Sequence, residues 1–226
     1  MKKPFILLMA VFLFSSLSVY AQDWPNLKKY EKANTEIDSN NPDGITAVFM
    51  GNSITEGWAS QDPEFLKDNN YVGRGISGQT TPQMLLRFRP DVIDLAPKVV
   101  VILAGTNDIA GNTGPMTVPQ IAGNIFSMAE LAKAHGIKVV ISSVMPVAKY
   151  PWSPEVESVK PIKELNAMLK EYADKNNIVY LDYFPALSND QRGMKKEYSK
   201  DGVHPTMEGY KTMEPLVVDA VNKALK

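Results

Sequence analysis

The sequence of 226 residues contains no cysteine and only two histidines. Without cysteine the chain has no disulfide scaffold and no cysteine that could carry a lipid at a new N-terminus, so its stability must come from a hydrophobic core. It also lacks an excess of charge, with 24 basic against 25 acidic residues, and it shows no internal repeat or low-complexity tract. These absences give no indication of nucleic-acid binding and fit an ordinary globular protein.

Residues 1–21 have the pattern of a secretory signal peptide, with two lysines, then an apolar run, then small residues before the cleavage site. The apolar run, residues 5–14, is about half of the ~20 residues that a membrane-spanning helix requires. We expect cleavage after Ala21, a secreted or periplasmic protein, and no stable membrane insertion. Loss of Lys2 and Lys3 changes the formal charge from −1 to −3. The remaining residues, 22–226, fit a single domain.

Short apolar runs alternate with longer segments of helical period in the rest of the chain. The runs expected to form strands are 46–50, 71–76, 99–104, 138–143 and 179–182. Between them, apolar residues recur at helical spacing, for example Ile121, Ile125 and Met128. This alternation predicts parallel strands joined by right-handed crossovers, and therefore a three-layer α/β/α sandwich. Ligands bind beyond the carboxyl ends of the strands in such sheets, so the segments that follow the strands matter most.

Three polar or glycine-containing segments follow the first three predicted strands, and a fourth lies near the C-terminus. The segments are Gly51-Asn52-Ser53, 75–78, 105–108 and 201–204. We expect them to converge on one edge of the sheet. Because a serine is a weak nucleophile alone, Ser53 needs a base that is itself oriented by a carboxylate.

The two histidines have different surroundings in the sequence. His135 ends a predicted helix just before Gly136, where a cation is favoured by the helix dipole, so we interpret it as a C-terminal capping residue. His204 follows Asp201 by three residues, a spacing that lets a tight turn aim the carboxylate at one ring nitrogen. The pair Asp201–His204 is therefore our candidate base, although an Asp-Gly turn with a surface histidine remains an alternative.

Ser53 also has a structural interpretation. Residues 53–56 match the capping-box pattern, in which Ser53 and Glu56 satisfy the first N–H groups of a helix. The two roles are compatible, because a helix N-terminus after a buried strand also favours a developing anion. The candidate donors to that oxyanion are the backbone N–H groups of Ser53 and Gly78 and the side-chain amide of Asn107. Asn107 is equally interpretable as a turn or cap residue, and Asp108 is able to cap as well.

The four segments, in this order and on an α/β pattern, resemble the sequence blocks of the SGNH (GDSL-type) hydrolases across nearly the whole mature chain. By this resemblance Ser53, Gly78, Asn107 and His204 are the four residues that name the group, and Asp201 completes a catalytic triad. The resemblance implies a flavodoxin-like fold with about five parallel strands, no cofactor and no metal ion.

The resemblance also implies an activity, which is hydrolysis of carboxylic esters through an acyl-enzyme on Ser53. Small secreted bacterial relatives, and the catalytic subunits of platelet-activating-factor acetylhydrolase, act on short acyl esters, often acetyl groups on sugars. Three residues depart from the family pattern, and they weaken the transfer of substrate preference. Asn52, Gly73 and Gln79 stand where the family often has aspartate, asparagine and aspartate.

Three aromatic residues are expected near the catalytic edge, where their rings are suited to stacking on a sugar. They are Trp58, Tyr150 and Trp152, and the alternative that they cover the core remains open. We therefore predict an esterase that removes acetyl or other short acyl groups from carbohydrate or small-molecule esters. The alternatives are a polysaccharide O-acyltransferase, a lysophospholipase- or thioesterase-type acylhydrolase, and an inactive carbohydrate-binding module. The sequence predicts no oligomeric state.

Overall fold

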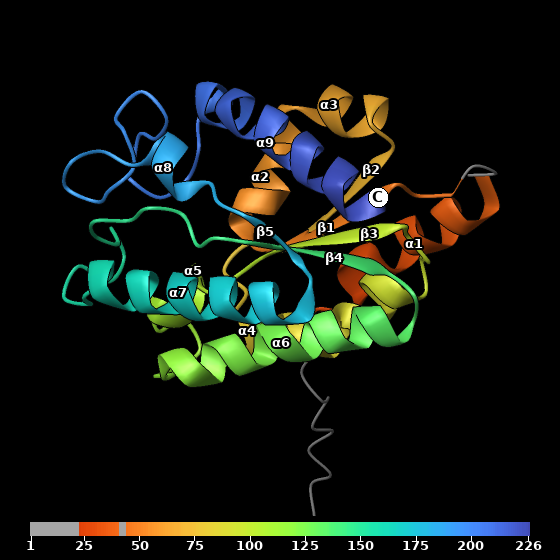
Figure 1. Ribbon diagram of the computed structural model, residues 1–226, viewed down its shortest axis with the longest axis horizontal. Coiled ribbons are helices and arrows are strands. Elements are labelled where there is room, and N and C mark those ends of the chain that lie inside the picture. The colour runs from red at the N-terminus through yellow and green to blue at the C-terminus, as the bar shows by residue number, and fades with distance from the viewer. Residues whose placement is uncertain (1–22, 41–43) are drawn as a thin grey trace, which may run out of the picture.

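A five-stranded parallel sheet forms the centre of the protein in a computed structural model, which describes residues 23–40 and 44–226 (Figure 1). Its strand order is β2-β1-β3-β4-β5, and every pair is parallel. The strands are β1 Ala47–Gly51, β2 Tyr71–Gly75, β3 Val99–Leu103, β4 Lys138–Ser142 and β5 Val179–Leu181. The five predicted strands and their parallel arrangement are confirmed. The predicted signal peptide lies outside the described residues.

Both faces of the sheet are covered by helices, as the predicted sandwich requires. On β1, Val48 and Met50 pack on one side with α4, α6 and α7, whereas Ala47 and Phe49 pack on the other with α2 and α9. This division follows from the alternation of side chains along a strand. The helices are α1 Lys28–Asn40, α2 Ser53–Gln61, α3 Pro63–Asp68, α4 Thr81–Phe88, the π-helical turn η1 Arg89–Ile93, α5 Thr106–Ile109, α6 Val118–Ala134, α7 Val159–Asn176, α8 Phe184–Leu187 and α9 Met207–Leu225.

The carboxyl ends of three neighbouring strands finish level with one another. Gly51 at the end of β1 is paired with Gly75 of β2 on one side and with Leu103 of β3 on the other. The segments that follow these strands therefore start side by side, which confirms their predicted convergence on one edge of the sheet.

Helix α1 precedes β1 in the chain. It packs against η1, and its Tyr30 hydroxyl donates a hydrogen bond to the carbonyl of Gly75. The Tyr30 ring also lies 4.7 Å from the Arg74 guanidinium carbon, in a cation–π arrangement. This helix thus supports the end of β2 and the loop that leaves it.

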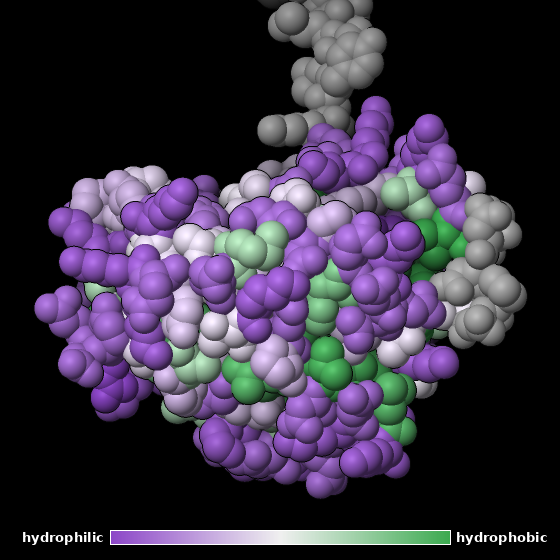
Figure 2. Space-filling view, turned by 90° about the horizontal axis from the view of Figure 1, so that it is seen from above, coloured by the Kyte–Doolittle hydropathy of each residue, from purple (hydrophilic) through white to green (hydrophobic). Residues whose placement is uncertain are grey.

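Hydrophilic side chains dominate the face shown in Figure 2, and hydrophobic side chains appear there in limited areas between them. Among the described residues, no helix combines the length and the apolar character needed to cross a bilayer.

Candidate active site

Ser53 is the first residue of α2, at the carboxyl end of β1. The cap of this helix is Asn52, whose side-chain oxygen accepts the Ile54 N–H at 3.1 Å. Glu56 does not reach back to the helix start and instead accepts the Ser77 N–H at 2.7 Å. The capping-box interpretation of Ser53 and Glu56 is therefore wrong, because the side chain of Asn52 and not that of Ser53 accepts an N–H group at the start of α2. The Ser53 hydroxyl is free to bond another partner.

That partner is His204. The Ser53 Oγ lies 2.9 Å from His204 Nε2, and His204 Nδ1 lies 2.6 Å from Asp201 Oδ2. An ionised carboxylate only accepts hydrogen bonds, so Nδ1 carries the proton in the neutral ring. Nε2 is then an acceptor, and it faces the serine hydroxyl as a base must.

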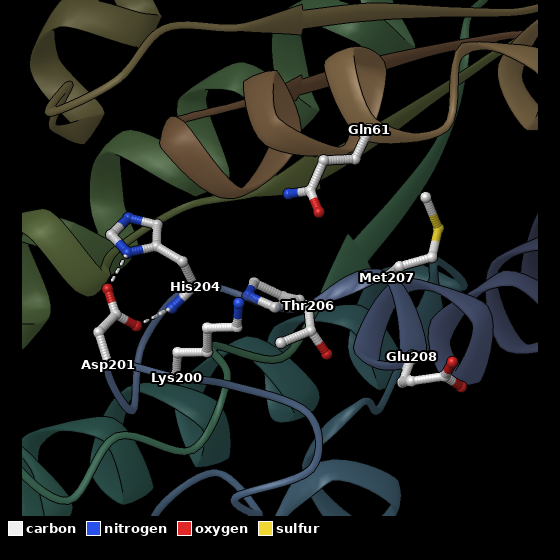
Figure 3. Close-up of a pocket in the computed structure, with 8 residues that line it drawn as sticks. Gln61, Lys200, Asp201, His204, Thr206, Met207 and Glu208 are labelled. Atoms are coloured by element: carbon white, nitrogen blue, oxygen red, sulfur yellow. Dashed lines mark hydrogen bonds and ion pairs between the residues drawn. The ribbon is translucent and has the colours of Figure 1, made fainter.

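The turn of residues 201–204 holds this geometry. Asp201 Oδ1 accepts the backbone N–H groups of Val203 at 2.9 Å and His204 at 2.8 Å, so one carboxylate oxygen shapes the turn while the other holds the ring. Figure 3 shows the two contacts of Asp201 with His204. Gly202 has φ +82°, a conformation that glycine adopts without strain. The Asp-Gly turn and the hydrogen-bonded Asp201–His204 pair are therefore the same structure and not alternatives.

Hydrogen bonds keep the Asp201 carboxylate ionised. Partial burial by itself raises the pKa, but the His204 ring and the N–H groups of His204 and Val203 outweigh burial and lower the pKa to about 2. Asp201 thus stays ionised down to strongly acidic pH. Because the pKa is depressed, its contribution to folding stability is present above the ordinary carboxyl pKa and is lost as the pH falls towards 2.

The loop after β2 lies beside the serine. Gln79 N–H donates to Ile76 O at 3.2 Å across a turn in which Gly78 has φ +77°. The side-chain amide of Asn107 donates to Gln79 O at 2.9 Å, which joins the loop after β2 to the start of α5. Within the described part of the chain, the backbone N–H groups of Ser53 and Gly78 have no protein acceptor. Both donors are therefore free for a ligand.

Asp108 has a capping role, but for a neighbouring helix. Its Oδ1 accepts the N–H of Thr81 at 2.9 Å and the Thr81 hydroxyl at 2.6 Å, at the start of α4. Burial raises the pKa of Asp108 despite these bonds. Of these two neighbouring residues, Asp108 caps α4 and Asn107 contacts the loop after β2. In the described ranges, no group of three or more histidine or acidic side chains is placed to hold a metal ion.

Comparison with known proteins identifies the family. Residues 49–212 match the sequence model of the GDSL-like lipase/acylhydrolase family. The chain belongs to this family. It is therefore a hydrolase of ester bonds. The GDSL resemblance read from the sequence is confirmed.

This acylhydrolase is similar to several known proteins. The crystal structure of a GDSL-like lipase from Bacteroides thetaiotaomicron is 48% identical, with a TM-score of 0.86, covering 89% of this chain and 100% of that one. Esterase TesA of Pseudomonas aeruginosa is 27% identical over 188 residues, which cover 81% of this chain and 85% of TesA. Lipoprotein YqeF of Bacillus subtilis is 37% identical over 79 residues, which are 34% of this chain and only 32% of YqeF.

His135 lies away from the candidate site, and its predicted capping role is confirmed. It is the C-terminal cap of α6, its Nδ1 lies 2.8 Å from Leu131 O, and Gly136 follows with φ +75°. The amino end of β4 begins just after it, so His135 is at the opposite edge of the sheet from Ser53.

Two of the three predicted substrate-binding aromatic residues are core residues. Trp58 is 2% exposed and stacks between Phe65 and Tyr210, with ring centroids 5.4 and 5.3 Å away. Tyr150 is fully buried, and its hydroxyl bonds Thr106. Neither ring has a face available to a sugar, so the prediction that Trp58 and Tyr150 bind substrate is wrong. For Trp58, the sequence does not show that α9 covers the ring.

Trp152 differs from the other two aromatic residues. It is 43% exposed, and its ring centroid lies 6.1 Å from that of His204. Its indole N–H donates to Asn112 Oδ1 at 3.1 Å. Trp152 is thus the predicted aromatic residue that the structure brings to the site.

Sequence reasoning missed Arg87, a fully buried residue of α4 that joins the segments around Ser53 and Gly78. Its guanidinium donates to Gly51 O at 2.9 Å, just before the serine turn, and to the side-chain oxygen of Gln79 at 2.6 Å. It also forms an ion pair with Asp91 at 2.8 Å, buried on both sides. In the sequence Arg87 looks like one exposed position of an amphipathic helix, so nothing there points to this role.

Replacement of Arg87 by methionine is expected to lower the free energy of unfolding by about 3 kcal/mol or more, because Asp91 is left as a buried, unpaired charge. Urea denaturation followed by circular dichroism measures this loss. The matched control is Arg89→Met, which removes an exposed pairing with Asp94 and should cost less than about 1 kcal/mol. Equal losses in the two variants would contradict the prediction.

Proposed function

We propose that this acylhydrolase works through an acyl-enzyme on Ser53, with His204 as general base and Asp201 as its orienting carboxylate. The observation that supports this most directly is the unbroken chain of hydrogen bonds from Ser53 through His204 to Asp201, at 2.9 and 2.6 Å. In this mechanism His204 Nε2 takes the hydroxyl proton as Ser53 Oγ bonds the ester carbonyl carbon. The negative charge moves to the carbonyl oxygen.

The N–H groups of Ser53 and Gly78 and the amide of Asn107 are the proposed donors to that oxyanion. As the tetrahedral intermediate collapses, the bond to the alcohol oxygen breaks and His204 returns the proton to the departing alcohol. A water molecule, deprotonated by His204, then attacks the acyl-enzyme and releases the acid and free Ser53. The Gly78 N–H supports this assignment because it has no protein acceptor among the described residues.

The proposed substrates are short acyl esters of carbohydrates, with acetyl as the preferred acyl group. The exposed indole of Trp152 beside His204 offers a flat face for a sugar ring.

A cavity lined by several side chains with hydrogen-bonding groups supports the carbohydrate assignment. It measures about 540 Å³ and opens beside Asp201 and His204. Gln61, Lys200 and Thr206 line it, and the Gln61 side-chain amide points from α2 into the space (Figure 3). Such groups suit the hydroxyls of a sugar better than a lipid tail.

Acyl-chain preference on p-nitrophenyl esters tests this proposal. We expect kcat/KM for the acetyl ester to exceed that for the octanoyl ester by roughly tenfold or more, since each poorly housed methylene disfavours the transition state. Mass spectrometry of acetylated xylan, pectin and sialoside oligomers should then show loss of acetyl groups. A preference for octanoyl would contradict the carbohydrate assignment and favour a lysophospholipase- or thioesterase-type activity.

Two further measurements separate hydrolysis from the remaining alternatives. Acetyl groups appearing on an added sugar acceptor would favour an O-acyltransferase. No turnover together with no labelling by a fluorophosphonate would favour an inactive carbohydrate-binding module. We also propose a secreted or periplasmic location, supported by the signal-peptide pattern of residues 1–21.

A further inference from the structure

Asn112 lies in the exposed loop that follows α5, and it contacts three parts of the candidate site. Its backbone N–H donates to Asn107 O at 3.0 Å. Its side-chain NH₂ donates to Gly78 O at 3.1 Å, and its side-chain oxygen accepts the indole N–H of Trp152 at 3.1 Å. One surface residue is thus bonded to both proposed oxyanion residues outside α2 and to the exposed aromatic ring beside His204.

Hydrogen bonds on both sides of Asn112 fix the loop that carries it. Gly111 has φ +78° and donates its N–H to Asp108 O at 3.0 Å, which turns the chain back towards the site. On the far side, the Thr113 hydroxyl bonds the Thr80 hydroxyl at 2.9 Å, next to the loop that carries Gly78. The Asn112 backbone is therefore held on both sides, and its amide is placed by the fold.

A carboxamide is planar, with an acceptor on one side and donors on the other. When Trp152 occupies the oxygen of Asn112, the NH₂ group must point the other way, towards Gly78 O. The orientation of the Trp152 indole and the position of the Gly78 peptide are consequently linked through one rigid group. Glutamine is too long by one methylene to keep both distances, and aspartate has no donor for Gly78.

We propose that Asn112 is a positioning residue that couples Trp152 to Gly78, so that a ring stacked on Trp152 steadies the oxyanion donor. This inference rests on the proposed function, in which the alcohol part of the ester lies against Trp152. The contact between the alcohol part and Trp152 then stabilises the transition state more than the bound substrate, so it raises kcat and not only the affinity.

The test compares kcat and KM of four variants on p-nitrophenyl acetate and on an acetylated xylo-oligosaccharide. Asn112→Ala should lower kcat on the oligosaccharide by about three- to tenfold, the effect of one net hydrogen bond, with a smaller loss on the p-nitrophenyl ester. Asn112→Asp keeps the acceptor for Trp152 but loses the donor to Gly78, and it should lower kcat on both substrates. Trp152→Phe keeps the ring and loses the N–H, so kcat on the oligosaccharide should fall while KM changes little.

The fourth variant, Asn176→Ala, is the matched control. Asn176 also donates its side-chain NH₂ to a backbone carbonyl, that of Tyr172 at 2.8 Å, but at the end of α7 remote from Ser53. It should leave kcat unchanged. Combining Asn112→Ala with Trp152→Phe should cost no more than Asn112→Ala alone, because the two changes break the same link.

Additive losses in that double variant, or kcat values for Asn112→Ala and Asn112→Asp within about twofold of wild type, would overturn the coupling. A wild type that turns over p-nitrophenyl acetate but not the oligosaccharide also overturns it while leaving the serine mechanism standing. Loss of activity in Ser53→Ala, measured alongside, shows whether the serine mechanism itself holds.

Discussion

Ser53→Ala is expected to lower kcat on p-nitrophenyl acetate by at least about a thousandfold, because no other group can form the acyl-enzyme. The hydroxyl that is removed has His204 Nε2 as its partner at 2.9 Å. Helix α2 should keep its stability, since its N-terminus is capped by Asn52 and not by Ser53. The variant should therefore unfold like wild type while losing both turnover and labelling by a fluorophosphonate.

Ser60→Ala provides the control for this experiment. Ser60 lies on the same helix, and its hydroxyl donates only to the carbonyl of Gly57, at 3.0 Å. Its replacement should leave kcat and labelling unchanged. Retention of more than about a thousandth of wild-type turnover in Ser53→Ala would contradict the acyl-enzyme mechanism.

Asp201→Asn is expected to lower kcat by about 10³ to 10⁴, although it changes the structure little. The asparagine oxygen can still accept the N–H groups of Val203 and His204, which hold the turn at 2.9 and 2.8 Å. The NH₂ group then faces His204 Nδ1, so this nitrogen becomes the acceptor and the proton moves to Nε2. A protonated Nε2 cannot take the proton of Ser53.

The pH dependence of this variant separates charge from geometry. Because hydrogen bonds lower the pKa of Asp201 to about 2, the wild-type carboxylate is ionised at every pH from 5 to 9. The loss in Asp201→Asn should therefore be similar across that whole range. The control is Asp190→Asn, an exposed acid in a loop after α8, which should keep wild-type kcat. Recovery of Asp201→Asn activity at one end of the range would contradict the tautomer explanation.

Much of the fold is readable from the sequence because the physical signals are local. The buried strands are short β-branched runs, and the ends of α6 and α9 carry a glycine and a capping threonine. The candidate base was identified because one of only two histidines stands in a capping position. The parallel sheet then brings the segments after β1, β2 and β3 together without further information.

The interactions that sequence reasoning missed all depend on tertiary contacts. The burial of Trp58 depends on Tyr210, 152 positions later in the chain, and the role of Arg87 depends on the carbonyl of Gly51. Neither contact leaves a periodic pattern. Asn112 gives no local signal either, because an exposed asparagine beside a glycine is typical of any turn.

The distance along the chain between Ser53 and His204 has a consequence for folding. These residues are 151 positions apart, and the hydroxyl of Tyr210 on α9 bonds the carbonyl of Ile54, 156 positions away. We expect such contacts to form late, because closing so long a stretch of chain costs entropy until the intervening sheet has formed. We therefore expect Ser53 and His204 to meet only when α9 docks on the first strand–helix unit, so that a partly folded chain carries a sheet and helices without the proposed hydrolytic site.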